Sequence, residues 1–167
     1  KNLPLLIQAF DEFRGDPRFK EYELVLAGRD GFDAGSLRRL AKKLPNRDAV
    51  RFLGPVTDAE RVLLYNCARS VVFPSWFEGF GFPPLEAQAC GVPAIAADRT
   101  SLPEILGNSA LLIDPWQIGA LTKELRAIES DAKLRENIIT AGLLNVKRFS
   151  WAQAAEQTLA VFKKATN

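Results

Sequence analysis

Two glutamates and two glycines lie close together near the middle of the chain. Seven residues separate Glu78 from Glu86, and Gly79 and Gly81 follow the first glutamate closely. A carboxylate can accept two hydrogen bonds, which suits the neighbouring hydroxyl groups of a sugar or a ribose. Glycine has no side chain, so its backbone can approach a ligand closely. These residue types favour a ligand that is rich in hydroxyl groups.

The residues around this motif add a site for an anion. An apolar run at 70–74 predicts a buried strand, and the prolines at 83–84 predict the start of a helix. A helix N-terminus carries positive partial charge and favours phosphate. Since proline has no N–H group, the donors would be the amides of 79–82 and of Leu85. An anion site between two hydroxyl acceptors is the chemistry of a nucleotide-sugar site.

A purely structural interpretation of the same residues stays open at this point. Glu86 lies in the first helical turn, where its charge would complement the helix dipole. Glu78 would then be an ordinary solvated loop residue. The pattern Gly-x-Gly is also shorter than the Gly-x-Gly-x-x-Gly fingerprint of dinucleotide-binding proteins. Spacing alone does not decide between a ligand site and a helix start.

The elements that must position these residues alternate between strand and helix. Apolar runs predict strands at 22–28, 50–54, 70–74, 93–97 and 110–113. Periodicity and capping sequences, including those at 57–60 and 101–104, predict helices at about 3–13, 37–44, 57–67, 83–91, 116–129, 131–147 and 151–165. This alternation predicts an α/β fold with a doubly wound parallel sheet. The 74–82 turn would lie at the carboxyl end of a strand, where such sheets bind ligands.

The order of elements predicts an incomplete sheet. The chain opens on a helix, whereas a doubly wound domain normally opens on a strand, which is central in the order 3-2-1-4-5-6. We therefore expect residues 1–167 to form one domain that lacks its first strand, which would lie upstream or come from elsewhere.

Composition excludes several classes of function. The 167 residues include no histidine, which excludes a Ser-His-Asp triad, a Cys-His pair and histidine-ligated metals within this chain. A net charge of +2 gives no argument for nucleic acid as a partner. The two cysteines lack CxxC spacing, so we expect them to be small buried apolar residues.

Nothing in the chain reads as a transmembrane helix or a signal peptide, so we expect a cytoplasmic protein. The basic pairs at 38–39 and 42–43 read as a solvated helix face. A minority interpretation makes them a contact with an acidic partner or with the inner face of a membrane.

The motifs also resemble those of a known enzyme family. The runs 73–75, 78–83, 85–87 and 91–93 resemble the donor motif of retaining glycosyltransferases of family 4, also called group 1. The resemblance continues through 101–104, 107–110 and 114–115, includes 1–3 and 53–56, and covers nearly the whole chain. It implies a GT-B fold, in which two Rossmann-like domains enclose a cleft. This chain looks like the C-terminal, donor-binding half.

The resemblance implies a role for individual residues. Glu78 matches the catalytic first glutamate near the donor sugar's hydroxyls, Glu86 matches the second, on the ribose, and Lys1 matches a lysine that contacts the diphosphate. Five further matches have a backbone that would face the diphosphate and sugar: Gly79, Phe80, Gly81, Phe82 and Leu85. Two more, Val56 and Arg61, would lie near the nucleobase. One departure is Gln88, a polar residue on an expected buried face where the family usually has Met.

The resemblance implies the donor-binding domain of a hexosyltransferase of polysaccharide biosynthesis. It would use a GDP-mannose or UDP-sugar donor and a glycan or lipid-linked acceptor, the latter bound by the N-terminal domain that this chain lacks. We expect no cofactor and no metal, since Lys1, the loop amides and the helix end would stabilise the charge on the leaving diphosphate. The alternative is a nucleotide-binding module with no activity in isolation.

Overall fold

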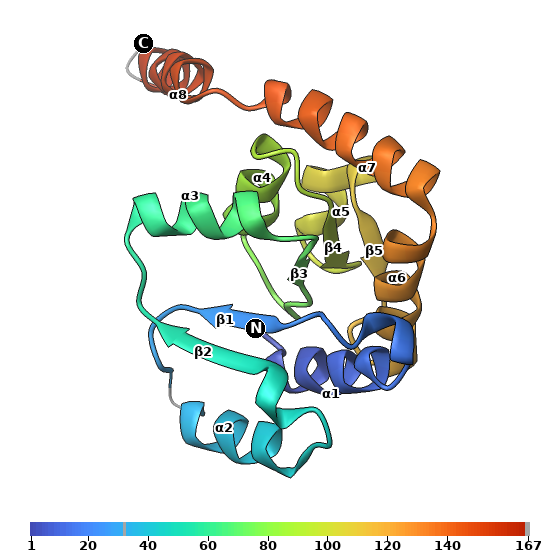
Figure 1. The fold of residues 1–167 in the computed structure, drawn as a ribbon. Helices are drawn as coiled ribbons and strands as arrows, with labels where there is room; N and C mark the ends of the chain where they lie inside the picture. The colour runs from blue at the N-terminus through green and yellow to red at the C-terminus, as the bar shows by residue number, and fades with distance from the viewer. Residues whose placement is uncertain (32, 166–167) are drawn as a thin grey trace.

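A computed structural model describes residues 1–31 and 33–165, and these form an α/β fold (Figure 1). The strands are β1 (Leu24–Ala27), β2 (Val50–Gly54), β3 (Val71–Phe73), β4 (Ala94–Ala97) and β5 (Leu111–Ile113). The helices are α1 (Leu3–Arg14), α2 (Ala34–Lys43), α3 (Asp58–Cys67), α4 (Phe82–Ala89), α5 (Leu102–Leu106), α6 (Ile118–Ser130), α7 (Ala132–Asn145) and α8 (Trp151–Ala165). Short 3-10 turns lie at Pro17–Phe19, Arg47–Ala49, Gly107–Ser109 and Val146–Arg148. The predicted strands and helices are confirmed to within a few residues.

The described strands form two separate parallel ladders. β1 pairs with β2, and β4 pairs with both β3 and β5. No ladder joins β1 to β3 within residues 1–31 and 33–165. The split falls where the order 3-2-1-4-5-6 places the strand that would precede α1. The parallel pairing agrees with the predicted doubly wound fold, and the expectation of a missing first strand stays a prediction.

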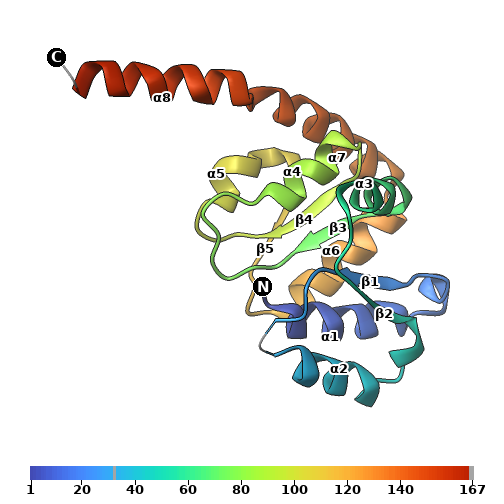
Figure 2. The same cartoon turned by 90° about the vertical axis from the view of Figure 1, so that its left-hand side faces the viewer.

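Strand β1 is less buried than its apolar sequence predicts. Leu24 and Leu26 pack on the core, but Val25 points to the opposite face and is 44% exposed. Both views place α1 and α2 on one side of the β1–β2 ladder and α3 on the other (Figures 1 and 2). Helix α3 has no buried residue. One face of β1 is therefore left largely uncovered.

Helix α1 and helix α6 form the main core together with residues from both ladders. The buried face of α1 includes Leu6, Phe10 and Phe13, which belong to one cluster with Ile95 of β4 and Ile113 of β5. Leu24 and Leu26 of β1 pack against the same cluster. Burying each large apolar side chain contributes roughly 1.5–3 kcal/mol. The apolar face of α1 thus holds the two ladders together.

Strand β4 is the most buried of the described strands, in agreement with its continuous apolar sequence. Ile95 points toward α1 and α6, whereas Ala94 and Ala96 point toward a second cluster formed with α4 and α5. All four residues of β4 are fully buried. The small side chains on the second face bring α4 and α5 close to the sheet.

Gln88 of α4 is buried, as its place on the helix predicts, and its side-chain amide is hydrogen-bonded to polar neighbours. Its Nε2 donates to the carbonyl oxygen of Ser109 at 2.9 Å and to the Ser109 Oγ at 2.8 Å. Its Oε1 accepts from the Nδ2 of Asn145 at 3.0 Å. A Cβ atom added at Gly142 would lie 2.9 Å from the Gln88 Cγ. The glutamine is therefore accommodated by residues of the 3-10 turn at Gly107–Ser109 and of α7.

Replacing Gln88 by Met should destabilise the protein by about 2 kcal/mol, because buried polar partners lose their hydrogen bonds. Urea denaturation of wild type and Gln88→Met gives the change in unfolding free energy. Gln153→Met, at an exposed position of α8, is the matched control. An unchanged unfolding free energy in Gln88→Met would contradict this account of the buried network.

Helix α8 extends away from the rest of the chain (Figure 2). All of its residues are exposed. Trp151, the first residue of the helix, is 80% exposed and stacks on Phe82, with ring centres 6.0 Å apart.

Candidate functional site

The loop between β3 and α4 is held by side chains from the loop between β4 and α5. Thr100 Oγ1 accepts a hydrogen bond from the Glu78 backbone N–H at 3.1 Å. Ser101 Oγ donates to the carbonyl oxygens of Glu78 and Phe80 at 3.0 and 3.3 Å. The sequence predicts Ser101 as a helix cap, but its side chain makes no capping bond in α5. The hydroxyl serves the neighbouring loop instead, so the capping prediction is wrong.

Glu78 is an anchored residue rather than a solvated one. Its side chain is 15% exposed, and Oε1 accepts hydrogen bonds from Lys1 Nζ and from the Oγ of buried Ser75, the latter at 2.6 Å. Burial raises the pKa of Glu78, but the hydrogen bonds from Lys1 and Ser75 outweigh it and leave the pKa below its ordinary value. Glu78 is therefore a carboxylate in contact with an ammonium group.

The start of α1 places Lys1 beside this carboxylate. The next residue, Asn2, is buried and donates from Nδ2 to the carbonyl oxygen of Pro115 at 2.8 Å. The Lys1 ammonium lies 4.9 Å from the centre of the Phe73 ring. Its side chain is 61% exposed, so it remains accessible to a ligand. The structure thus brings together Lys1 and Glu78, which are 77 positions apart in the chain.

The two glycines of the motif have different structural roles. Gly81 has a φ of +100°, and a Cβ atom there would lie 2.5 Å from the Leu102 Cδ2. A side chain at this position would disrupt both the backbone and the packing of α5. A Cβ atom at Gly79 would meet no other protein atom within 4 Å. The space beside Gly79 is therefore open to a ligand.

The N-terminus of α4 offers few amide donors. The helix begins at Phe82, with Gly81 as its N-cap. The backbone N–H groups without a helical acceptor belong to the N-cap and the first three helical residues, and two of these three are prolines. Leu85 is the fourth residue, where the N–H normally bonds to the N-cap carbonyl, and its side chain is buried. Contacts of Phe80, Phe82 and Leu85 with a ligand stay predictions.

Glu86 lies between α4 and α3. Its Oε2 accepts a hydrogen bond from the Tyr65 hydroxyl at 2.9 Å and lies 3.4 Å from the Arg61 Nε. Burial, followed by the hydrogen bond to Glu86, raises the pKa of Tyr65. Arg61 also pairs with Asp58 at 3.1 Å. Sequence reasoning missed Tyr65, although its place four residues after Arg61 puts both side chains on one helix face.

Val56, predicted to lie near a nucleobase, is half-buried.

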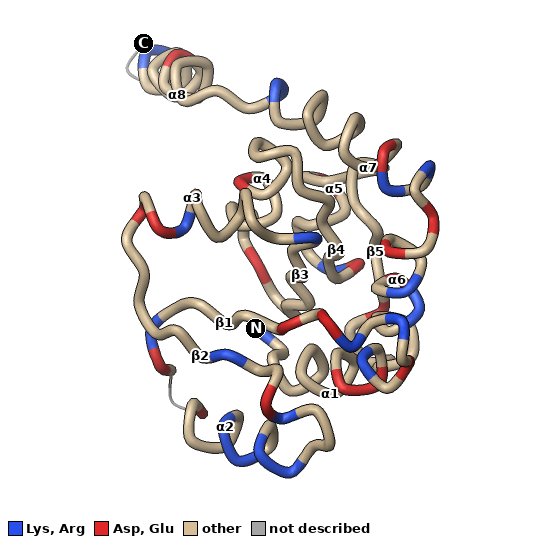
Figure 3. Tube along the Cα trace, in the orientation of Figure 1, with Lys and Arg blue, Asp and Glu red and all other residues tan. Residues whose placement is uncertain are grey.

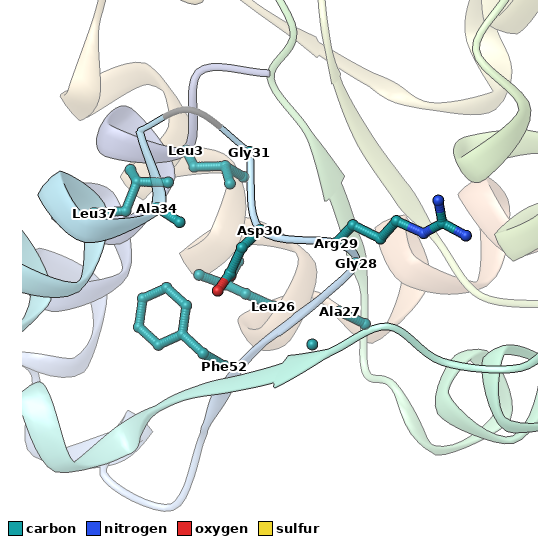
Figure 4. A pocket seen from close by; sticks show the side chains of 11 residues that line it. Leu3, Leu26, Ala27, Gly28, Arg29, Asp30, Gly31, Ala34, Leu37 and Phe52 are labelled. Atoms are coloured by element: carbon teal, nitrogen blue, oxygen red, sulfur yellow. The ribbon is translucent and has the colours of Figure 1, made fainter.

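A small cavity lies at the carboxyl ends of β1 and β2 (Figure 4). Its volume is about 80 Å³, and Gly28 and Gly54 at the two strand ends contribute to its wall. Asp30, also in its wall, pairs with Arg38 at 3.1 Å, and the Arg38 guanidinium lies 4.6 Å from the centre of the Phe52 ring. Neither Glu78 nor Glu86 lines this cavity.

Exposed aromatic rings lie on the loops after β3 and β5. Trp76 and Trp116 stack with ring centres 5.1 Å apart and are 46% and 62% exposed. Trp116 follows the buried residue Pro115, but its own ring lies at the surface and packs on Trp76.

Lysine and arginine gather on α2 (Figure 3). Arg39, Lys42 and Lys43 are exposed, which agrees with the predicted solvated face. Cys67 is exposed and Cys90 half-buried, both free, so the prediction of two buried cysteines is wrong.

In residues 1–31 and 33–165, no group of three His, Cys, Asp or Glu side chains could hold a metal ion. The same residues form no helix long and apolar enough to cross a membrane.

Comparison with known proteins identifies the family. The model of the family "Glycosyl transferases group 1" matches residues 1–145. The O-antigen chain mannosyltransferase B of Escherichia coli is 36% identical over 163 residues, which cover 98% of this chain and 42% of that protein. The chain therefore belongs to the group 1 glycosyl transferase family, as its motifs predict.

Solved structures agree with this assignment. Sucrose-phosphate synthase from Thermosynechococcus elongatus has a TM-score of 0.85 at 26% identity and matches 99% of this chain and 42% of its own. The C-terminal domain of a glycosyl transferase group 1 family protein (LpcC) from Francisella tularensis has a TM-score of 0.77 at 26% identity, and the match covers 89% of this chain and 78% of that domain. The fold is that of a Rossmann-like domain of these enzymes.

Replacing Glu78 by Gln should remove stability that depends on pH. The folded pKa of Glu78 is below its ordinary value of 4.5, so its contribution is full above that value and is lost as the pH falls through the folded pKa. Wild type should therefore be more stable than Glu78→Gln at about pH 7, and the difference should shrink as the pH falls through the folded pKa of Glu78. Urea denaturation over a series of pH values measures the difference.

Glu104→Gln, at an exposed position of α5, controls for the general effect of removing one carboxylate. Equal stability of wild type and Glu78→Gln at about pH 7 would show that the Lys1–Glu78 contact does not stabilise the fold.

Proposed function

We propose that this chain binds a nucleotide diphosphate sugar and that the intact protein transfers the hexose with retention of anomeric configuration. The observation that carries the proposal is the meeting of the Lys1 ammonium and the Glu78 carboxylate beside Gly79, next to the N-terminus of α4. A cation and amides there suit a diphosphate. Glu78 suits the hydroxyl groups of the sugar.

In this proposal the chain stabilises charge rather than forming a covalent bond. As the bond from the sugar to the diphosphate breaks, negative charge grows on the leaving group. In this scheme Lys1 and the free amides of the loop would stabilise that charge. Glu78 orients the sugar, and Glu86 accepts from the ribose. No metal and no cofactor enter this scheme.

The relatives narrow the proposed substrates. The E. coli relative is named an O-antigen chain mannosyltransferase, so we favour mannose, from GDP-mannose, over the UDP-sugar alternative. Val56 would lie near the nucleobase. Arg61 would act there less directly, because its guanidinium already contacts Asp58 and Glu86. The acceptor would be a glycan or a lipid-linked glycan at the cytoplasmic face of a membrane.

A second candidate function is nucleotide binding without catalysis by this chain alone. The chain spans 42% of the length of the E. coli relative. A reaction that needs an acceptor held opposite the donor loses its proximity advantage when the acceptor-binding half is absent. We therefore expect the isolated chain to bind a donor but not to turn it over.

Calorimetric titration of the chain with GDP, UDP and ADP tests donor binding, and we expect GDP to bind most tightly. Gly79→Ala should weaken that binding by about tenfold or more, since its methyl group would occupy the open space where the phosphates approach. Gly119→Ala in α6, which also meets only open space, is the matched control and should bind like wild type. Failure of all three nucleotides to bind at millimolar concentration would overturn the proposal.

Glu78→Ala in the full-length protein should lower turnover by about 100-fold or more while largely sparing nucleotide affinity, because the lost contact is with the sugar. Release of nucleotide diphosphate with acceptor present measures turnover, and calorimetry measures affinity. Glu104→Ala should behave like wild type. Full turnover in Glu78→Ala would remove Glu78 from the reaction.

A further inference from the structure

The carboxylate of Glu86 is anchored through one of its two oxygens. Both the Tyr65 hydroxyl, at 2.9 Å, and the Arg61 Nε, at 3.4 Å, approach Oε2. Among the described residues, no side chain or backbone donor contacts Oε1. The Glu86 side chain is 33% exposed, so this oxygen can reach a ligand. The geometry fixes the carboxylate and leaves one acceptor unused.

These contacts do not follow from core packing. Tyr65 and Arg61 both belong to α3, which has no buried residue. The start of α3 is fixed by a capping box in which Thr57 and Glu60 exchange hydrogen bonds. From that fixed start, residues four apart lie on the same face of the helix, and this face meets Glu86. The helix therefore brings two donors to a single carboxylate oxygen.

We propose that Tyr65 and Arg61 are positioning residues that hold Glu86 so that Oε1 accepts from the ribose hydroxyls, which makes the site selective for ribonucleotides over deoxyribonucleotides. The inference rests on the proposed function and extends it, since it names the residues that enforce the choice of sugar in the nucleotide.

The chemistry of the three groups supports this selectivity. An arginine has donors only, and the Tyr65 hydroxyl directs its one proton to Glu86, so in both contacts the carboxylate is the acceptor. An ionised carboxylate only accepts hydrogen bonds, so the free oxygen needs a donor, which a ribose hydroxyl provides. A deoxyribose lacks a hydroxyl donor at the position where the oxygen is missing. A carboxylate held in one orientation cannot turn to another partner, so the deoxy form leaves it unpaired.

Calorimetric titration with GDP, UDP and their 2′,3′-dideoxy forms measures the selectivity. Wild type should bind the ribose form of its preferred nucleotide roughly 10- to 100-fold more tightly than the dideoxy form. Tyr65→Phe removes only the hydroxyl and should reduce this ratio by about tenfold, by weakening binding of the ribose form. Affinity for the dideoxy form should stay the same.

Tyr22→Phe is the matched control. The Tyr22 hydroxyl also donates to a carboxylate, that of Glu129, at 2.6 Å, but Glu129 lies on α6. Loss of the Tyr22 hydroxyl removes the same kind of hydrogen bond and should leave the ratio of ribose to dideoxy affinities unchanged. Thermal unfolding of both variants shows whether the fold is retained. Arg61→Ala should reduce the ratio as Tyr65→Phe does, whereas Arg47→Ala, which breaks an exposed pair with Asp48, should not.

The outcomes separate this inference from the proposed function. If Tyr65→Phe weakens the ribose and dideoxy forms by the same factor, or weakens neither, Tyr65 has only a structural role and the inference is wrong. Glu86→Ala should abolish the selectivity, and full selectivity in that variant would overturn the role of Glu86 itself. If no diphosphate binds wild type, the proposed function and this inference both fail.

Discussion

Helix α1 packs its apolar face against both strand ladders, and the position of the site depends on that packing. The described strands of the two ladders share no hydrogen bonds with each other. Phe10 and Phe13, together with α6, link them through buried apolar surface. Because a helix is rigid, burial of its middle also fixes its N-terminal end, just before which Asn2 bonds to Pro115 and Lys1 contacts Glu78. Core packing thus sets the position of a surface charge pair.

The loops at the site are held by polar side chains rather than by apolar packing. Thr100 and Ser101 contact the backbone on both sides of Gly79, and Ser75 contacts the Glu78 carboxylate. A loop held in this way has already lost conformational freedom, so a ligand does not have to order it. The same loop keeps open space beside Gly79. Rigidity and access therefore coexist at one position.

The sequence was a good guide where local pattern decides structure and a poor one where distant elements meet. The continuous apolar run of β4 and the capping box of Thr57 and Glu60 both predict what is observed. Ser101 has the sequence of a cap, yet its hydroxyl is used by another loop. Trp116 is exposed because the loop after β5 lies at the surface, and Tyr65 contacts Glu86 only because α3 packs beside α4. Such pairings depend on tertiary contacts that have no periodic signature.

The contact between Lys1 and Glu78 has a consequence for donor binding. In the proposed function a diphosphate would compete with Glu78 for the ammonium, because its two phosphates together carry more negative charge than one carboxylate. When Lys1 turns to the diphosphate, one hydrogen bond to Glu78 Oε1 is lost, while the bond from Ser75 remains. The carboxylate then has an acceptor site available where a sugar hydroxyl can donate. In the proposed function, Lys1 and Glu78 pair with each other when no ligand is bound and contact the donor when it is. This change of partners would couple recognition of the phosphate to recognition of the sugar.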